Sequence, residues 1–146
     1  MQALKVGVIL SLQNLHMTGR SLSALSIPLL LLTACSKEPG DGGRAEIRGT
    51  ILEQAYSPSG NPDGDPYPAV DQEVYIIYGD GQYHDDDTRT GPNGEFRFAW
   101  LRKGSYRIYA ISECDNENCR EGIYRTVEIV GRREIVTAPA ITIANY

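Results

Sequence analysis

The sequence predicts an all-β fold, a single β-sandwich of about seven strands that covers residues 45–146. Two observations predict this fold class. From Ala45 onward, short runs of β-branched and aromatic residues alternate with turn signals at intervals of about ten residues. No stretch carries a convincing 3.6-residue hydrophobic period with caps at both ends. The 146 residues leave room for one domain.

The first predicted strand, AEIRGTILEQA over 45–55, has a period of two, with Ile47, Gly49 and Ile51 on one face. A polar loop rich in proline and glycine follows over 56–70 and forbids a regular ladder. The next run, EVYIIY, is apolar on both faces, which predicts a central strand.

A polar strand, HDDDTRT, and a tight-turn signal, GPNG over 91–94, lead to the clearest strand, EFRFAW. Its alternation predicts that Phe96, Phe98 and Trp100 point into the core. The following strand, SYRIYAISE, continues the inward set with alternate apolar residues, Tyr106, Ile108 and Ala110. GIYRTVEIV and EIVTAPAITIA close a domain with the size of an immunoglobulin-like sandwich.

Residues 1–34 predict a signal peptide rather than part of the fold. They contain no acidic residue, only Lys5 and Arg20 as basic residues, and an apolar centre over 22–34. That centre is shorter than the roughly 20 apolar residues that a membrane-spanning helix needs. Met17 offers an alternative start, which makes 1–16 either an elongated n-region or a mis-assigned beginning.

The four residues Leu32-Thr33-Ala34-Cys35 resemble the lipobox of bacterial lipoproteins, in which a small residue precedes the modified cysteine. The resemblance implies that the signal is cut before Cys35, that the thiol takes a diacylglycerol and that the new amino group is acylated. Several acyl chains together hold a protein durably on a membrane. The alternative is a plain secretory signal that leaves Cys35 as a free thiol.

The resemblance to lipoproteins also implies a location. Ser36 is not the aspartate that retains lipoproteins of diderm bacteria at the inner membrane. We therefore expect a lipid-anchored protein of the bacterial cell envelope, at the outer membrane, on its periplasmic or surface face. Residues 35–44, which are charged and rich in glycine, predict a flexible tether between the lipid and the domain.

The other two cysteines, Cys114 and Cys119, are spaced C-x4-C and predict a disulfide in an oxidising compartment. Half of a zinc site is the alternative, but it needs two further soft ligands and residues 35–146 offer only His84. The loop that the disulfide closes is short, so chain entropy predicts a stabilisation of about 2 kcal/mol.

EIRGTI, DQEVYIIY and TRTGPNGEFRFAWLRKGSYRIYAI together resemble the carboxypeptidase regulatory-like domain, a transthyretin-like β-sandwich. The matching positions are Gly49, Ile51, Val74, Ile76, Thr90, Gly94, Phe96, Phe98, Leu101, Gly104 and Tyr106. Glycines stand where turns favour a positive φ, and aromatic residues where a core face alternates. The resemblance implies a fold and no activity, because each match is a folding residue. A longer loop over 56–68 and the CDNENC hairpin depart from the family.

Charge and motifs exclude several functions. The formal net charge is −5 without any Lys/Arg block, which speaks against nucleic acid and against an anionic membrane surface as partners. His84 and Asp85 are adjacent on a strand and point to opposite faces, so they predict no catalytic pair. Two enzyme families with related β-folds, the hydroxyisourate hydrolases and the intradiol dioxygenases, need more histidines than residues 35–146 offer, which contain only His84. We predict no catalytic residue, no cofactor and no enzyme.

Two acidic groups invite a calcium hypothesis: Asp85–Asp87 with Asp80 nearby, and the loop NPDGDP over 61–66. Neither has the spacing of a calcium-binding loop. Acidic residues on an edge strand also prevent edge-to-edge pairing, and this interpretation is favoured.

The nine tyrosines, against two phenylalanines, suit either strands or a sugar-stacking surface. Tyr78 and Tyr106 are expected to serve their strands, while the loop residues Tyr56, Tyr67 and Tyr83 are candidates for exposure.

Together these features predict a lipid-anchored, non-catalytic module of the cell envelope, which binds or supports an envelope protein or glycan. The alternatives are a calcium-dependent adhesion or glycan-binding module and an accessory subunit of an envelope hydrolase. Two observations distinguish these alternatives. One is whether calcium raises the melting temperature of the protein, and the other is which genes lie beside its own.

Overall fold

The computed structural model describes residues 38–115 and 119–146, and all regular structure in these ranges is β. Nine strands follow one another along the chain: β1 (Asp41–Ala55), β2 (Tyr67–Pro68), β3 (Glu73–Tyr78), β4 (Asp86–Arg89), β5 (Glu95–Leu101), β6 (Gly104–Glu113), β7 (Arg120–Ile129), β8 (Ile135–Thr137) and β9 (Ile141–Asn145). The described ranges contain no helix with the length and apolarity needed to span a membrane.

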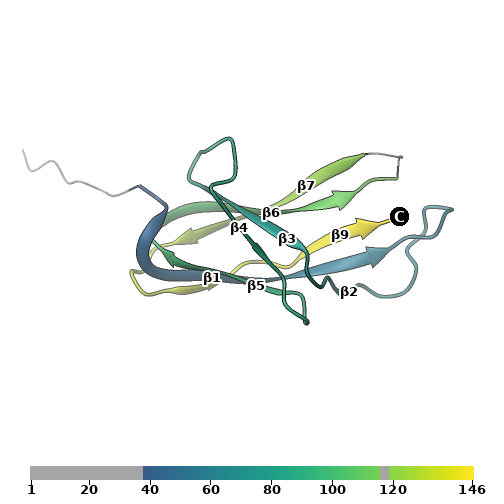
Figure 1. Ribbon diagram of the computed structural model, residues 1–146, viewed down its shortest axis with the longest axis horizontal. Coiled ribbons are helices and arrows are strands. Elements are labelled where there is room, and N and C mark those ends of the chain that lie inside the picture. The colour runs from purple at the N-terminus through teal and green to yellow at the C-terminus, as the bar shows by residue number, and fades with distance from the viewer. Residues whose placement is uncertain (1–37, 116–118) are drawn as a thin grey trace, which may run out of the picture. The chain divides into compact units, whose positions relative to one another are not determined.

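The strands form two sheets, as Figure 1 shows. In the first sheet β1 is central, with β2 and β5 antiparallel to it and β8 and β9 parallel to it. The second sheet has the order β4-β3-β6-β7 and is antiparallel throughout. The prediction of an all-β, two-sheet domain is therefore confirmed, and EVYIIY is indeed a central strand.

One hydrophobic core lies between the sheets and includes Ile47, Ile51, Val74, Ile76, Phe96, Phe98, Leu101, Tyr106, Ile108, Ile129 and Ile141. The predicted alternation holds in β1, where Ile47, Gly49 and Ile51 are buried. It also holds in β6, where Tyr106, Ile108 and Ala110 are each 0% exposed. In the described ranges all core residues come from positions 45–143, so the compact unit Cys35–Tyr146 has a core of its own, as a part that folds independently needs.

Trp100 does not point into the core, and that prediction is wrong. Its side chain is 69% exposed, while Leu101 takes the buried position that follows Phe98. Between the pairs Ala45↔Leu101 and Ile47↔Phe98, β5 advances three residues while β1 advances two. This β-bulge inserts one extra residue, and Trp100 absorbs the bend with a φ of +61°. The bulge shifts the alternation by one residue and turns the indole outward.

The strand count also differs from the predicted seven. EIVTAPAITIA forms two short strands, β8 and β9, separated by the segment around Pro139, whose missing N–H interrupts a ladder. β2 is a two-residue strand inside the long polar loop. In addition β1 begins at Asp41, so the last four residues of the segment predicted as a tether belong to the sheet.

The sandwich has an N-terminal end and a far end. At the N-terminal end, residues 38–44 join the domain: Pro39 packs on Gly104, and the Gly40 amide donates to the Tyr106 hydroxyl at 3.0 Å. At the far end, β1, β6 and β9 finish and β3 and β7 begin. The loop 56–66 extends from this far end, where β6 ends and β7 begins (Figure 1).

Candidate functional site

The structure describes two of the three cysteines identified in the sequence. Cys35 lies outside the described residues, so its lipidation stays a prediction. Cys114 and Cys119 form a disulfide, with their Cα atoms 5.2 Å apart. The predicted pairing is confirmed, and it closes the turn between β6 and β7 at the far end.

Two of the aspartates considered for calcium accept hydrogen bonds from the backbone. Asp85 Oδ2 accepts from the Tyr78 amide at 2.7 Å, and Asp86 Oδ1 accepts from the Asp87 amide at 2.9 Å. Asn61, in the second acidic segment, donates its side-chain amide to the Ser59 hydroxyl at 3.0 Å. Within 38–115 and 119–146, no three His, Cys, Asp or Glu side chains come together in a group that could hold a metal ion.

Three tyrosines form a row across the outer face of the second sheet. Tyr75, Tyr109 and Tyr124 are paired across β3, β6 and β7, and we call them the tyrosine row. Ring centroids lie 4.9 Å apart between Tyr75 and Tyr109 and 4.8 Å apart between Tyr109 and Tyr124, close to the spacing of neighbouring strands. Because the rings face one another, the row presents ring edges and hydroxyl groups to solvent.

His84 lies beside the tyrosine row and is exposed. The prediction that His84 and Asp85 lie on a strand is wrong, because both precede β4, which begins at Asp86. Its ring centroid is 5.0 Å from that of Tyr75, and its Nδ1 is 3.5 Å from the Tyr109 hydroxyl. The hydrogen bond from the Tyr75 hydroxyl to Glu73 at 2.7 Å, together with burial, raises the pKa of Tyr75 to about 12. Burial likewise raises the pKa of Tyr109. Both phenols therefore stay neutral at physiological pH and can donate hydrogen bonds.

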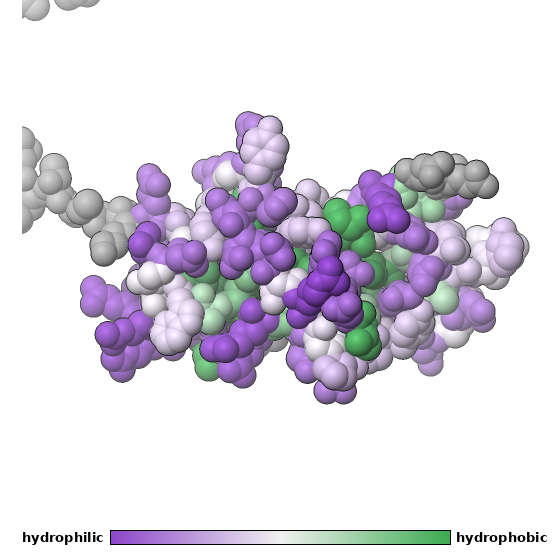
Figure 2. Space-filling model, viewed as in Figure 1, coloured by the Kyte–Doolittle hydropathy of each residue, from purple (hydrophilic) through white to green (hydrophobic). Residues whose placement is uncertain are grey.

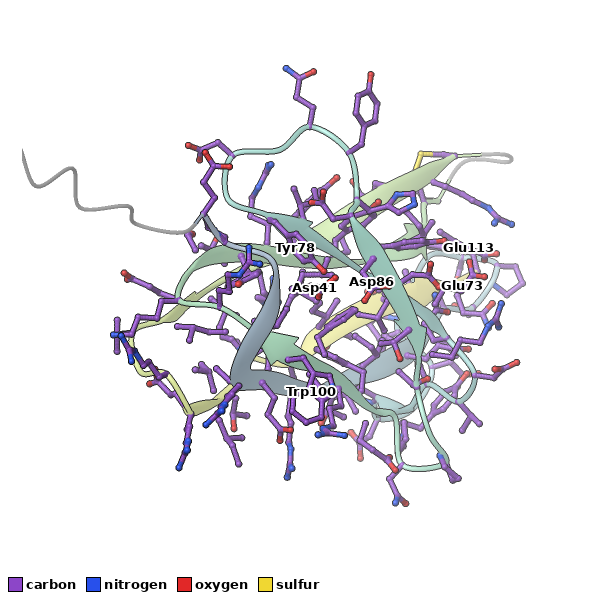
Figure 3. The ribbon with its side chains drawn as sticks, turned by 60° about the vertical axis from the view of Figure 1, so that its left-hand side comes forward. Asp41, Glu73, Tyr78, Asp86, Trp100 and Glu113 are labelled. Carbon is purple, nitrogen blue, oxygen red and sulfur yellow. A yellow bond between two sulfur atoms is a disulfide. The ribbon has the colours of Figure 1, made fainter. Side chains whose placement is uncertain are left out.

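A groove of about 280 Å³ opens at the far end, and we call it the far-end groove. Its lining residues are Glu53, Gln72, Glu73, Tyr75, Ile111, Ser112, Glu113, Arg120, Ile143, Ala144 and Asn145. Figure 3 shows the side chains of Glu73 and Glu113 close to one another at this end. Tyr75 belongs to both the groove and the tyrosine row, so the two features are continuous.

Neighbouring groups hold the carboxylates of the far-end groove in place. Glu53 Oε1 accepts from the Tyr67 hydroxyl at 2.5 Å and from Asn145 Nδ2 at 2.6 Å. Glu113 Oε2 accepts from the Tyr146 amide at 3.1 Å. These bonds fix the orientation of each carboxylate. Because each carboxylate has further lone pairs, acceptors remain for a ligand. The arrangement is preorganised before anything binds.

The groove offers hydrogen bonds rather than a nucleophile. Ser112 Oγ donates to the Glu113 carbonyl at 3.0 Å and accepts from the Ala144 amide at 2.8 Å. The residue is 3% exposed, and its hydroxyl is committed to the backbone. Around it stand carboxylates, which accept, and the amides of Gln72 and Asn145, which can do both. These donors and acceptors can form hydrogen bonds with hydroxyl groups.

Sequence reasoning missed the far-end groove. Glu53, Glu73 and Glu113 stand near the ends of three different strands and share no motif. The tyrosine row left a partial signal, because Tyr75, Tyr109 and Tyr124 each alternate with inward-facing residues. Only the register between strands places them side by side. Of the loop tyrosines, Tyr67 and Tyr83 are exposed, while Tyr56 is half-buried and stacks on Tyr146.

Comparisons with known proteins add one distant likeness. No protein-family model matches this chain, and no curated protein matches it significantly. Among solved structures, a candidate carbohydrate-binding protein from Pseudomonas aeruginosa has a TM-score of 0.41 and 16% sequence identity, over 73% of this chain and 91% of that one. At this distance the likeness assigns neither a fold type nor a ligand to the present chain.

Proposed function

We propose that this protein is a lipid-anchored, non-catalytic module of the bacterial cell envelope that binds a glycan in its far-end groove. The observation that carries the proposal is the groove itself: preorganised carboxylates and side-chain amides beside a row of tyrosines. The proposed anchor is Cys35, on the strength of the lipobox resemblance.

The position of the groove suits a tethered binding module. Residues 38–44 join the sandwich at the N-terminal end, where Gly40 bonds to Tyr106 and Tyr78 bonds to Asp41. The groove lies at the opposite end, because β1 runs from Asp41 to Ala55 between the two. A chain attached through Cys35 would therefore turn its N-terminal end toward the membrane and hold the far-end groove away from it.

The lining of the groove suits a sugar. Neighbouring hydroxyls of a sugar ring can donate to a carboxylate and accept from an amide or from Arg120, all present in the lining. Tyrosine adds apolar area and a hydroxyl in one rigid side chain. A volume of about 280 Å³ is at the lower end for small-molecule sites, which favours one sugar unit of a longer chain.

The anchor is tested by replacing Cys35 with serine in a bacterial host that lipidates its lipoproteins. After a wash with about 0.5 M salt, which removes electrostatic attachment, we expect the wild-type chain in the membrane fraction and Cys35→Ser in the supernatant, because the variant has no acyl chains to hold it. The double variant Cys114→Ser/Cys119→Ser is the control: it removes the disulfide at the far end, keeps Cys35 and should remain on the membrane. Retention of Cys35→Ser on salt-washed membranes, or a mature N-terminus whose mass contains no fatty chains, would contradict the anchor.

Glycan binding is tested with the chain from residue 35 that carries Cys35→Ser, which cannot be acylated. It is applied to an array of peptidoglycan fragments, lipopolysaccharide cores and O-antigen oligosaccharides, and the strongest binder is titrated by calorimetry. Glu113→Gln should weaken that binding about tenfold or more, since a hydrogen bond to a charged group is lost. Glu128→Gln, at the N-terminal end, should leave the Kd unchanged. No binding to any glycan, or equal effects of the two variants, would refute the groove as the site.

A further inference from the structure

We propose that the N-terminal end of the sandwich is a membrane-docking surface, where a basic groove binds the phosphates of anionic lipid headgroups. The proposal relies on the proposed function in one respect, since the anchor at Cys35 would place this end beside a bilayer. It adds a second, electrostatic attachment that needs no acyl chain.

The groove at this end is the larger of the two described and has a volume of about 1400 Å³. It is lined by Gly42, Gly43, Arg44, Leu101, Arg102, Lys103, Gly104, Glu128, Ile129, Val130, Arg132 and Arg133. Five of these residues are basic, and we call it the basic groove. They come from the start of β1, the β5–β6 turn and the β7–β8 turn, which the two sheets bring together.

The positive charge of the basic groove is largely uncompensated. In the described part of the chain, the ion pairs use Arg48, Arg89 and Arg97, and none uses a basic residue of this groove. Glu128 also lines the groove. Glu134, on the adjoining turn, accepts hydrogen bonds from the amides of Val130 and Gly131, at 2.9 and 2.6 Å.

The guanidinium group of Arg102 has a donor without a protein partner in the described part of the chain. Its Nε atom is buried and has no hydrogen-bond partner among the described residues. A buried donor without a partner costs free energy, and a phosphate oxygen could supply the missing acceptor. Guanidinium groups bind phosphate through paired N–H donors, so the four arginines suit this ligand better than isolated ammonium groups would.

The charges are separated along the molecule. From Cys35 onward the chain carries 12 basic and 19 acidic residues, yet five of the basic ones line this groove. The far-end groove, in contrast, has three glutamates and one arginine in its lining. A net negative charge therefore does not prevent this end from approaching an anionic surface, because screening limits each field to roughly 10 Å at 0.1 M salt.

Apolar side chains near the groove favour a lipid surface over a free phosphate ion. Val130 lines the groove and is 60% exposed. Trp100, 69% exposed, directly precedes the lining residues Leu101 and Arg102, and Figure 3 shows it pointing outward from β5. Tryptophan is enriched where proteins meet the headgroup region of membranes. Figure 2 shows one face of the domain, on which hydrophilic residues predominate and hydrophobic areas lie between them.

The test uses the chain from residue 35 with Cys35→Ser, so that any attachment is independent of lipidation. This chain should co-sediment with vesicles of phosphatidylcholine that contain about 30% phosphatidylglycerol. It should not co-sediment with vesicles of pure phosphatidylcholine. Arg133→Glu should lower the partition coefficient about tenfold or more, because it reverses a charge at the surface. About 0.5 M salt should release the wild-type chain.

Arg120→Glu is the matched control, because it makes the same change in net charge at the far end. It should leave partitioning unchanged. Equal losses for the two variants, or no binding to anionic vesicles, would overturn the proposal even if Cys35 proves to be acylated. Tight calorimetric binding of inorganic phosphate without vesicle binding would also overturn it, since the groove would then hold a free anion.

Discussion

Replacing Gly94 by alanine is expected to lower the free energy of unfolding by about 3 kcal/mol, for two separate reasons. Gly94 has a φ of +73°, a left-handed conformation that disfavours any residue with a Cβ atom. Its position is also crowded, because a Cβ atom there would collide with the Ile51 carbonyl oxygen. The backbone cannot easily withdraw, because the Ile51 amide donates to the Gly94 carbonyl at 2.8 Å. Chemical denaturation measures the change.

Gly60→Ala separates the two reasons. Gly60 has a similar φ, +77°, but nothing lies within 4 Å of the place that a Cβ atom would take. The substitution there should cost only the conformational part, about 1 kcal/mol. In thermal unfolding Gly94→Ala should lower the Tm by roughly 15 °C, and Gly60→Ala by much less. Equal losses at both positions would show that the contact with β1 does not exist as described.

Replacing Tyr106 by phenylalanine is expected to cost about 2 kcal/mol, although the ring stays in place. The side chain is 0% exposed, and its hydroxyl accepts from the Gly40 amide at 3.0 Å and donates to the Arg102 carbonyl at 2.8 Å. Burial raises the pKa of this phenol, so it remains a neutral donor. Without the hydroxyl, both backbone groups lose their partner, and an unsatisfied buried group costs more than a hydrogen bond gains.

Tyr124→Phe serves as the control for this experiment. Tyr124 is 49% exposed, and water can replace any bond that its hydroxyl makes. We expect a change within about 0.5 kcal/mol. Hydrogen exchange adds a local measurement: Tyr106→Phe should increase the exchange of the Gly40 amide. An unchanged rate at Gly40 would mean that Tyr106 does not hold this segment against the sandwich.

The outcome along β5 shows how far periodicity can reach. The alternation of EFRFAW correctly places Phe96 and Phe98 in the core, because alternate side chains of a strand lie on one face. It fails one step later, at Trp100. A bulge depends on how β5 pairs with β1, and the sequence of one strand does not show which strand it pairs with.

The sequence also did not predict that β8 and β9 pair in parallel with β1. EIVTAPAITIA looks like a single closing strand, yet β8 and β9 both run parallel to β1 and pair with different parts of it. Pro139, between them, favours a break, because proline cannot donate to a ladder. Which strand they would join was open until the two sheets were assembled.

The amino-acid sequence by itself determined the all-β class, most of the buried faces and the disulfide between Cys114 and Cys119, because these depend on local alternation and on spacing along the chain. The tertiary structure alone decided the tyrosine row and the two grooves. Their residues lie far apart in the chain and become neighbours only through strand register and the packing of one sheet on the other. The net charge could not predict the basic groove either, because a sum over residues does not show that five basic side chains lie at one end of the domain.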